Sequence, residues 1–91
     1  MNENRAYTPD ELDHAVDDVT RIVERLRVQG ATGIRPAVKK RGESISGHWW
    51  LVDITYVENR VVRGITPRTF INEAQARHVL EELRKACQKD V

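Results

Sequence analysis

The sequence predicts an α+β fold in the order α-β-β-β-α, in which a three-stranded antiparallel sheet packs against two helices. Two segments, residues 8–29 and 72–88, repeat apolar residues every three or four positions, which is typical of amphipathic helices. Between them lie three segments rich in β-branched and aromatic residues. Because the 91 residues contain no linker or internal repeat, we expect residues 1–91 to form a single domain with one core.

The first predicted helix has a clear start signal. Thr8 and Glu11 have the spacing of a capping box, and Pro9 suits the first turn of a helix. Acidic side chains dominate the polar side of this helix, and Gly30 ends it. The apolar stripe consists of Leu12, Ala15, Val16, Val19, Ile22, Val23 and Leu26. We expect this stripe to cover the core face of the sheet, with a dimer seam as the alternative.

Three strands are expected between the helices. Residues 34–41 are predicted to form an edge strand, because Pro36 has no amide hydrogen to donate within a sheet. Residues 41–47 are predicted to be a polar loop between two glycines. Residues 48–57 carry the strongest strand signal in the chain and are predicted to form the central strand.

The second half of the sheet follows from turn signals. Residues 58–59 are a plausible two-residue hairpin turn, since Asn59 tolerates positive φ, and they lead into a third strand at 60–65. Residues 66–69 are expected to break the sheet, and Asn72 is expected to cap the second helix. The buried stripe of that helix consists of Ala76, Val79, Leu80, Leu83 and Cys87.

Composition and motifs exclude several classes of function. No apolar run approaches the roughly 20 residues of a membrane span, and the polar N-terminal segment does not resemble a signal peptide. We therefore expect a cytoplasmic protein with no membrane partner, in which the single cysteine, Cys87, forms no internal disulfide. The three histidines lack metal-ligand spacing, and no nucleophile, phosphate-loop or dinucleotide motif occurs. This predicts a protein that is not an enzyme and holds no metal or cofactor.

The formal net charge of +1 conceals a segregation of charge along the chain. Residues 1–33 hold four basic and seven acidic side chains, whereas residues 34–70 hold seven basic and three acidic ones. A basic surface formed by the second segment would attract a polyanion although the whole molecule is nearly neutral. The alternative is an ordinary solvated surface.

Alternation along the strands assigns their side chains to two faces. Asp53 decides which face of the central strand is buried, because burying an unpaired carboxylate is costly. The face that carries Asp53 is therefore exposed. The predicted inward residues are Ile34, Val38, Trp50, Val52, Ile54 and Tyr56. The predicted outward residues are Arg35, Lys39, Arg41, Trp49, Leu51, Asp53, Thr55 and Val57.

This outward face supports two hypotheses. A basic β-sheet can lie in the major groove of double-stranded DNA, where Arg and Lys contact phosphates or guanine edges and apolar groups contact thymine methyls. Alternatively, Trp49 and Leu51 are buried by a protein partner or in a homodimer. The segregation of charge favours DNA.

Residues 33–86 resemble the three-stranded-sheet-plus-helix DNA-binding domain of phage-type tyrosine integrases and of plant AP2/ERF factors. The resemblance is carried by Gly33-Ile34-Arg35, by the strand at 50–55, by Gly64 at the end of the third strand and by the helix start at 69–76. It covers about 54 of the 91 residues. It implies a DNA-binding module of phage or mobile-element type that does not cut or join DNA by itself.

The resemblance also implies roles for individual residues. By position, the residues that face the major groove are Arg35, Leu51, Asp53 and Thr55, and those in the core are Trp50, Val52, Ile54 and Phe70. The family usually has an apolar inward residue where this chain has Arg63, which leaves the register of the third strand open, and we expect Arg63 to point outward. Residues 66–68 look like an insertion after the glycine. The complete predicted DNA-binding set is Arg35, Lys39, Arg41, Trp49, Leu51, Asp53, Thr55, Arg63 and Arg68.

A third hypothesis follows from the order of elements alone. Double-stranded RNA-binding domains share the α-β-β-β-α order. Their second helix begins with basic residues, whereas here it begins with Asn72-Glu73. RNA binding therefore ranks below DNA binding and protein interaction.

Overall fold

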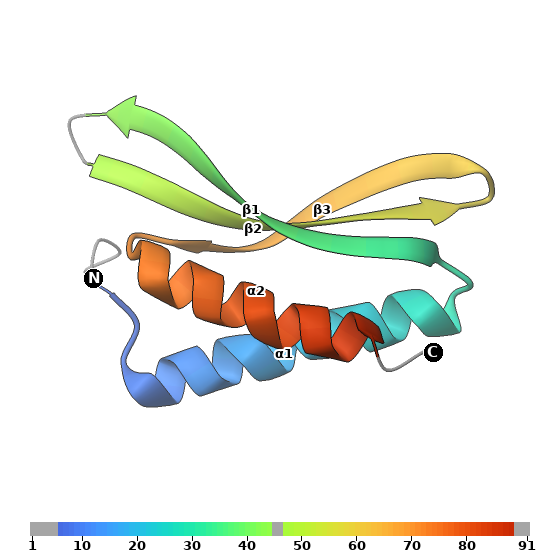
Figure 1. The fold of residues 1–91 in the computed structure, drawn as a ribbon, viewed down its shortest axis with the longest axis horizontal. Helices are drawn as coiled ribbons and strands as arrows, with labels where there is room; N and C mark the ends of the chain where they lie inside the picture. Colours follow the sequence, from blue (N-terminus) through green and yellow to red (C-terminus); the bar gives the residue numbers. More distant parts are fainter. Residues whose placement is uncertain (1–5, 45–46, 89–91) are drawn as a thin grey trace.

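The computed structural model describes residues 6–44 and 47–88, and it confirms the predicted α+β fold and its order of elements. The elements are α1 (Pro9–Val28), β1 (Thr32–Ser44), β2 (Gly47–Glu58), β3 (Val61–Phe70) and α2 (Glu73–Gln88). The strands pair antiparallel in the order β1-β2-β3, so β2 is central and Pro36 lies on an edge strand, as predicted. Both helices lie on one side of the sheet (Figure 1).

Local hydrogen bonds fix both ends of α1 where the sequence predicts them. The Glu11 amide donates to the Thr8 hydroxyl (3.2 Å) and the Thr8 amide donates to the Glu11 carboxylate (2.9 Å), which completes the capping box. At the other end, the amide of Gly30 donates to the carbonyl of Arg27 (3.0 Å), and the following amide donates to the carbonyl of Leu26 (2.9 Å). These two bonds form a Schellman motif, which Gly30 permits by adopting a φ of 94°.

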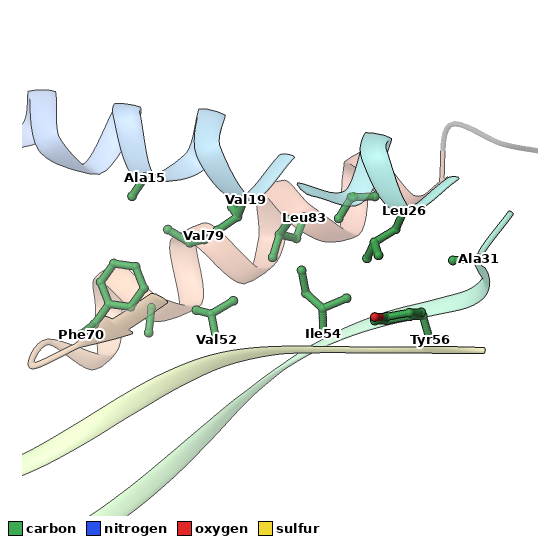
Figure 2. Packing of buried hydrophobic residues seen from close by; sticks show 12 residues of the cluster. Ala15, Val19, Leu26, Ala31, Val52, Ile54, Tyr56, Phe70, Val79 and Leu83 are labelled. Carbon is green, nitrogen blue, oxygen red and sulfur yellow. The ribbon is translucent and has the colours of Figure 1, made fainter. Parts of the chain in front are cut away.

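The hydrophobic core lies between β2 and the two helices (Figure 2). Val52 and Ile54 are completely buried and Tyr56 nearly so, which confirms the predicted faces of the central strand. The helices and β3 supply Ala15, Val19, Val23, Leu26, Phe70, Ala76, Val79 and Leu83 to the same cluster. Four residues of the apolar stripe of α1 are buried in this cluster and the other three are half-buried, which favours a role in covering the core over a dimer seam.

The segment before α1 is fastened to the start of α2. The Gln75 side chain accepts from the Tyr7 amide (3.0 Å) and donates to the Tyr7 carbonyl (2.7 Å). The Tyr7 ring lies 4.9 Å from the ring of Phe70, measured between centroids. Asn72 caps α2 as predicted, because its side-chain oxygen accepts from the Gln75 amide (3.2 Å). These contacts close one end of the core.

The first hairpin is longer than the sequence predicts. Residues 41–47 are polar and were expected to form a loop, but β1 continues to Ser44 and β2 begins at Gly47, with these two residues paired. The remaining two residues of the predicted loop, 45–46, lie outside the described part of the chain. These residues show no apolar alternation, so the sequence gives no strand signal there.

The second hairpin turn lies one residue later than predicted. Glu58 pairs with Val61, so the two turn residues are Asn59 and Arg60 rather than Glu58 and Asn59. Asn59 has a φ of 53° and Arg60 a φ of 67°. Positive φ at both central positions is characteristic of a type I′ turn, whose twist matches that of the two strands. Asn59 therefore occupies the first central position of the turn.

β3 does not end at residue 65, and residues 66–69 do not break the sheet. Ile65 pairs with Ile54 and Arg68 pairs with Val52, so Thr66 and Pro67 together stand opposite the single residue Asp53. This extra residue is a β-bulge, and on an edge strand it accommodates a proline without loss of a ladder hydrogen bond. The strand then continues to Phe70, and Gly64 lies within it rather than at its end.

Two glycine substitutions are expected to have opposite effects on stability. Gly30→Ala forces a side chain into positive φ and should lower the free energy of unfolding by about 1 kcal/mol. Gly64→Ala places a Cβ at an ordinary 3.8 Å from its neighbours and should raise stability by roughly 0.4–1 kcal/mol through the unfolded chain. Urea unfolding followed by circular dichroism measures both, and equal effects would contradict the Schellman assignment.

Candidate nucleic-acid interface

The side of the sheet turned away from the helices is the candidate interface, and we call it the open face. Strand register and burial place the following residues on it: Arg35, Ala37, Lys39, Arg41, Trp49, Leu51, Asp53, Thr55, Val57, Val62, Gly64 and Thr69. Figure 1 shows that α1 and α2 both lie on the opposite side of the sheet. Seven of the nine predicted DNA-binding residues therefore share one surface.

A basic row runs along β1 on the open face. Arg35, Lys39 and Arg41 are all exposed, and each is paired with a β2 residue on the same side of the sheet. Alternate residues of a strand are spaced about 6.6 Å apart, so this row is roughly 20 Å long. Gly33 and Ile34 form a β-bulge opposite Tyr56, and this bulge determines which residues of β1 face outward. Gly33 adopts a φ of 59° there.

The centre of the open face is less polar than its β1 edge. Trp49, Leu51 and Val57 are half-buried, while Thr55 is exposed beside Arg35. On β3, Val62 is 75% exposed opposite Val57. The open face therefore combines a cationic margin with an apolar and hydroxyl-bearing middle.

Asp53, in the middle of this face, contacts residues of both neighbouring strands. Its Oδ1 accepts a 2.6 Å hydrogen bond from the Thr66 hydroxyl, and its Oδ2 lies 3.6 Å from Nζ of Lys39. The side chain of Asp53 is only 16% exposed, so these partners compensate the cost of removing its charge from water. Thr66 was not predicted as part of the site. The sequence signal that could have identified it is the neighbouring Pro67, because a proline within a strand is found at edges and bulges.

Arg63 is not on the open face, which corrects the sequence prediction. It pairs with Tyr56, whose side chain points to the helices, and directly opposed residues share a face. Arg63 is nevertheless exposed, and its Nε lies 3.6 Å from Oε1 of Glu58. Val61, which pairs with Glu58 next to the turn, is 50% exposed, so the inward face is also solvated near the hairpin turn. A charged residue at that position is thus no evidence for an outward orientation.

Arg68 is the second predicted residue that lies on the other side of the sheet. The bulge at Thr66 and Pro67 shifts the alternation of β3, so Arg68 stands opposite the buried Val52 and its guanidinium donates to the Asp18 carboxylate of α1. Burial opposes the charged form of Arg68, but the hydrogen bonds to Asp18 and Tyr7 outweigh it and raise the pKa of the guanidinium. Arg68 therefore belongs to the helix side of the molecule.

No protein-family model, curated protein or solved structure matches the chain. The likeness to integrase-type and AP2 domains therefore remains a prediction from the residues. Within the described residues, neither helix has the length and apolarity needed to cross a lipid bilayer.

Thr66→Val tests the structural role of Asp53. The substitution keeps the shape of the side chain but removes the hydroxyl donor, and it should lower the free energy of unfolding by about 1 kcal/mol. Thr69→Val is the matched control, because Thr69 lies on the same strand and face and its hydroxyl is not bonded within the described residues. Chemical denaturation of the two variants measures the difference, and equal stabilities would show that the Thr66 hydroxyl does not support the bulge.

Proposed function

We propose that the open face binds double-stranded DNA, with the sheet lying in the major groove. The observation that carries this proposal is the basic row of Arg35, Lys39 and Arg41 along one margin of a sheet face that neither helix covers. The major groove is about 12 Å wide and admits a β-ribbon, so the edge of a twisted sheet fits it with one strand near the phosphates. The resemblance to integrase-type domains supports the same orientation.

The residues of the open face divide the work of recognition. Arg35 and Arg41 form no ion pair within the described residues, so both guanidinium groups are available to phosphates or to guanine edges. Leu51 and Thr55 in the centre of β2 offer methyl groups to thymine. Phosphate contacts set position and affinity, while the central side chains read sequence.

In the free protein, the positive charge of the basic row is partly compensated by Asp53. Lys39 is paired with Asp53, and this carboxylate lies on the surface that approaches a polyanion. A carboxylate can accept from the amino group of cytosine in the major groove. Elsewhere along a bound duplex, the same carboxylate repels phosphates and lowers affinity.

Fluorescence anisotropy with a labelled duplex tests DNA binding. For the natural chain, affinity should fall steeply between 50 and 200 mM salt, and the double substitution Arg35→Gln, Arg41→Gln should weaken binding and reduce the salt slope by about 1 per lost phosphate contact. The control Arg77→Gln, Arg84→Gln removes the same charge from the exposed side of α2, and it should leave affinity within about twofold. Equal weakening in both variants would show a nonspecific charge effect and contradict an interface on the open face.

Asp53→Asn separates the electrostatic role of this residue from its structural one. The asparagine still accepts from Thr66 but no longer neutralises Lys39, so affinity for a random duplex should rise by about two- to tenfold at 50 mM salt. The gain should shrink as salt is raised, because the interaction is screened. Anisotropy titrations at two salt concentrations measure it, and an unchanged affinity would place Asp53 outside the interface.

A protein partner or a second copy is the alternative occupant of the open face. The observation in its favour is the apolar content of the face, where Trp49, Leu51 and Val57 are half-buried and Val62 is 75% exposed. Sedimentation of the chain discriminates the two functions. A dimer that persists at high salt, with no DNA binding at low salt, would favour protein interaction. Titration with an RNA duplex separates DNA binding from RNA binding, because the deep and narrow major groove of RNA does not admit a sheet.

A further inference from the structure

A cleft between α1 and β3 lies on the helix side of the sheet, away from the open face. Its volume is about 360 Å³. It is lined by Asp18, Arg21, Ile22 and Arg25 of α1 and by Pro67 and Arg68 of β3. The cleft is shallow and largely open to solvent, so its lining rather than its volume indicates the class of ligand.

Two features of the chain bring these residues together. The residues of α1 are three and four positions apart, so they share one face of the helix. On the other wall, the bulge of β3 turns Arg68 towards α1, where its guanidinium donates to Asp18. The bulge thus builds the second wall of the cleft.

The cleft carries an excess of positive charge. Three guanidinium groups face one carboxylate, and that carboxylate is already bonded to Arg68. Arg21 and Arg25 have no side-chain partner among the described residues. Like charges four positions apart on a helix repel, so an anion between these two arginines would relieve a repulsion present in the free protein.

The chemistry of the walls indicates the class of ligand. Guanidinium groups bind phosphate oxygens in bidentate fashion, and several of them select a group with more than one negative charge. Ile22 and Pro67 are half-buried and give the cleft an apolar floor beside the arginines. A ligand that combines phosphates with a flat, weakly polar body satisfies both parts.

We propose that this cleft binds a nucleoside diphosphate or triphosphate, with the phosphates on Arg21 and Arg25 and the base or sugar against Ile22 and Pro67. The exposed part of Arg68 adds a third contact, since its side chain is 35% exposed. The site is separate from the open face, because its arginines lie on α1 and at Arg68, on the helix side of the sheet.

Titration of the full chain with ADP, pyrophosphate and adenosine at about 50 mM salt, followed by two-dimensional NMR, tests the proposal. ADP should bind saturably, pyrophosphate more weakly and adenosine not measurably, with amide shifts centred on Ile22, Arg25 and Arg68. Pyrophosphate binding as tight as ADP would overturn the role of Ile22 and Pro67. Shifts centred on the open face, or no saturable binding of ADP below about 1 mM, would overturn the site.

Matched variants assign the charge. Arg21→Gln, Arg25→Gln should lower ADP affinity about tenfold or more without loss of thermal stability, because neither side chain has a partner to lose among the described residues. Arg77→Gln, Arg84→Gln removes equal charge from α2 and should leave ADP affinity unchanged. Asp18→Asn should tighten ADP binding, since it removes the only carboxylate of the cleft lining. Equal loss of ADP affinity in the two double variants would overturn the proposal. Displacement of ADP by a short DNA duplex would also overturn it, because the cleft would then be part of a DNA-binding surface.

Discussion

One extra residue in β3, opposite Asp53, determines which side chains in the second half of that strand face the helices. Before the bulge, β3 alternates in step with β2, and after Thr66 and Pro67 the alternation is displaced by one position. In a regular strand, Phe70 would stand opposite Trp49 on the open face. With the bulge, Phe70 stands opposite Trp50 and enters the core, where it is 1% exposed. The largest fully buried side chain among the described residues thus depends on this displacement.

The same displacement divides the arginines between two surfaces. It removes Arg68 from the face that carries Arg35 and Arg41 and brings it against α1. The molecule consequently has a basic row on one side of the sheet and a basic cleft on the other. Asp53 and Asp18 hold equivalent places in these two sites, since each carboxylate pairs with one cation and leaves the neighbouring cations free to bind.

Features encoded by local spacing were predictable from the sequence. The capping box at Thr8, the end of α1 at Gly30 and the cap of Asn72 each depend on residues within five positions of one another. The two faces of β2 were predictable because alternation persists through an unbroken strand and Asp53 fixes its phase. Alternation in β2, and in β1 from Ile34 onward, likewise assigned seven of the candidate site residues to the correct face.

Features that depend on pairing between strands were not predictable in this way. A proline within residues 66–69 indicates a break, and only the hydrogen-bonded partner strand reveals that the chain absorbs it in a bulge. The prediction for Arg63 is wrong because a charged residue does not mark the outward face near the hairpin turn, where both faces meet solvent. The cleft joins α1 to β3 across about 45 residues of sequence, and no local pattern records that contact.

The two prolines of the sheet, Pro36 and Pro67, occupy its two outer strands. An outer strand normally offers a row of unused amide and carbonyl groups to which another chain can add as a further strand. Pro36 removes one donor from β1, and Pro67 lies in the bulge that bends β3. Each border is therefore interrupted near its middle. The protein can expose one face of its twisted sheet to solvent and still resist the edge-to-edge pairing of copies that leads to aggregation.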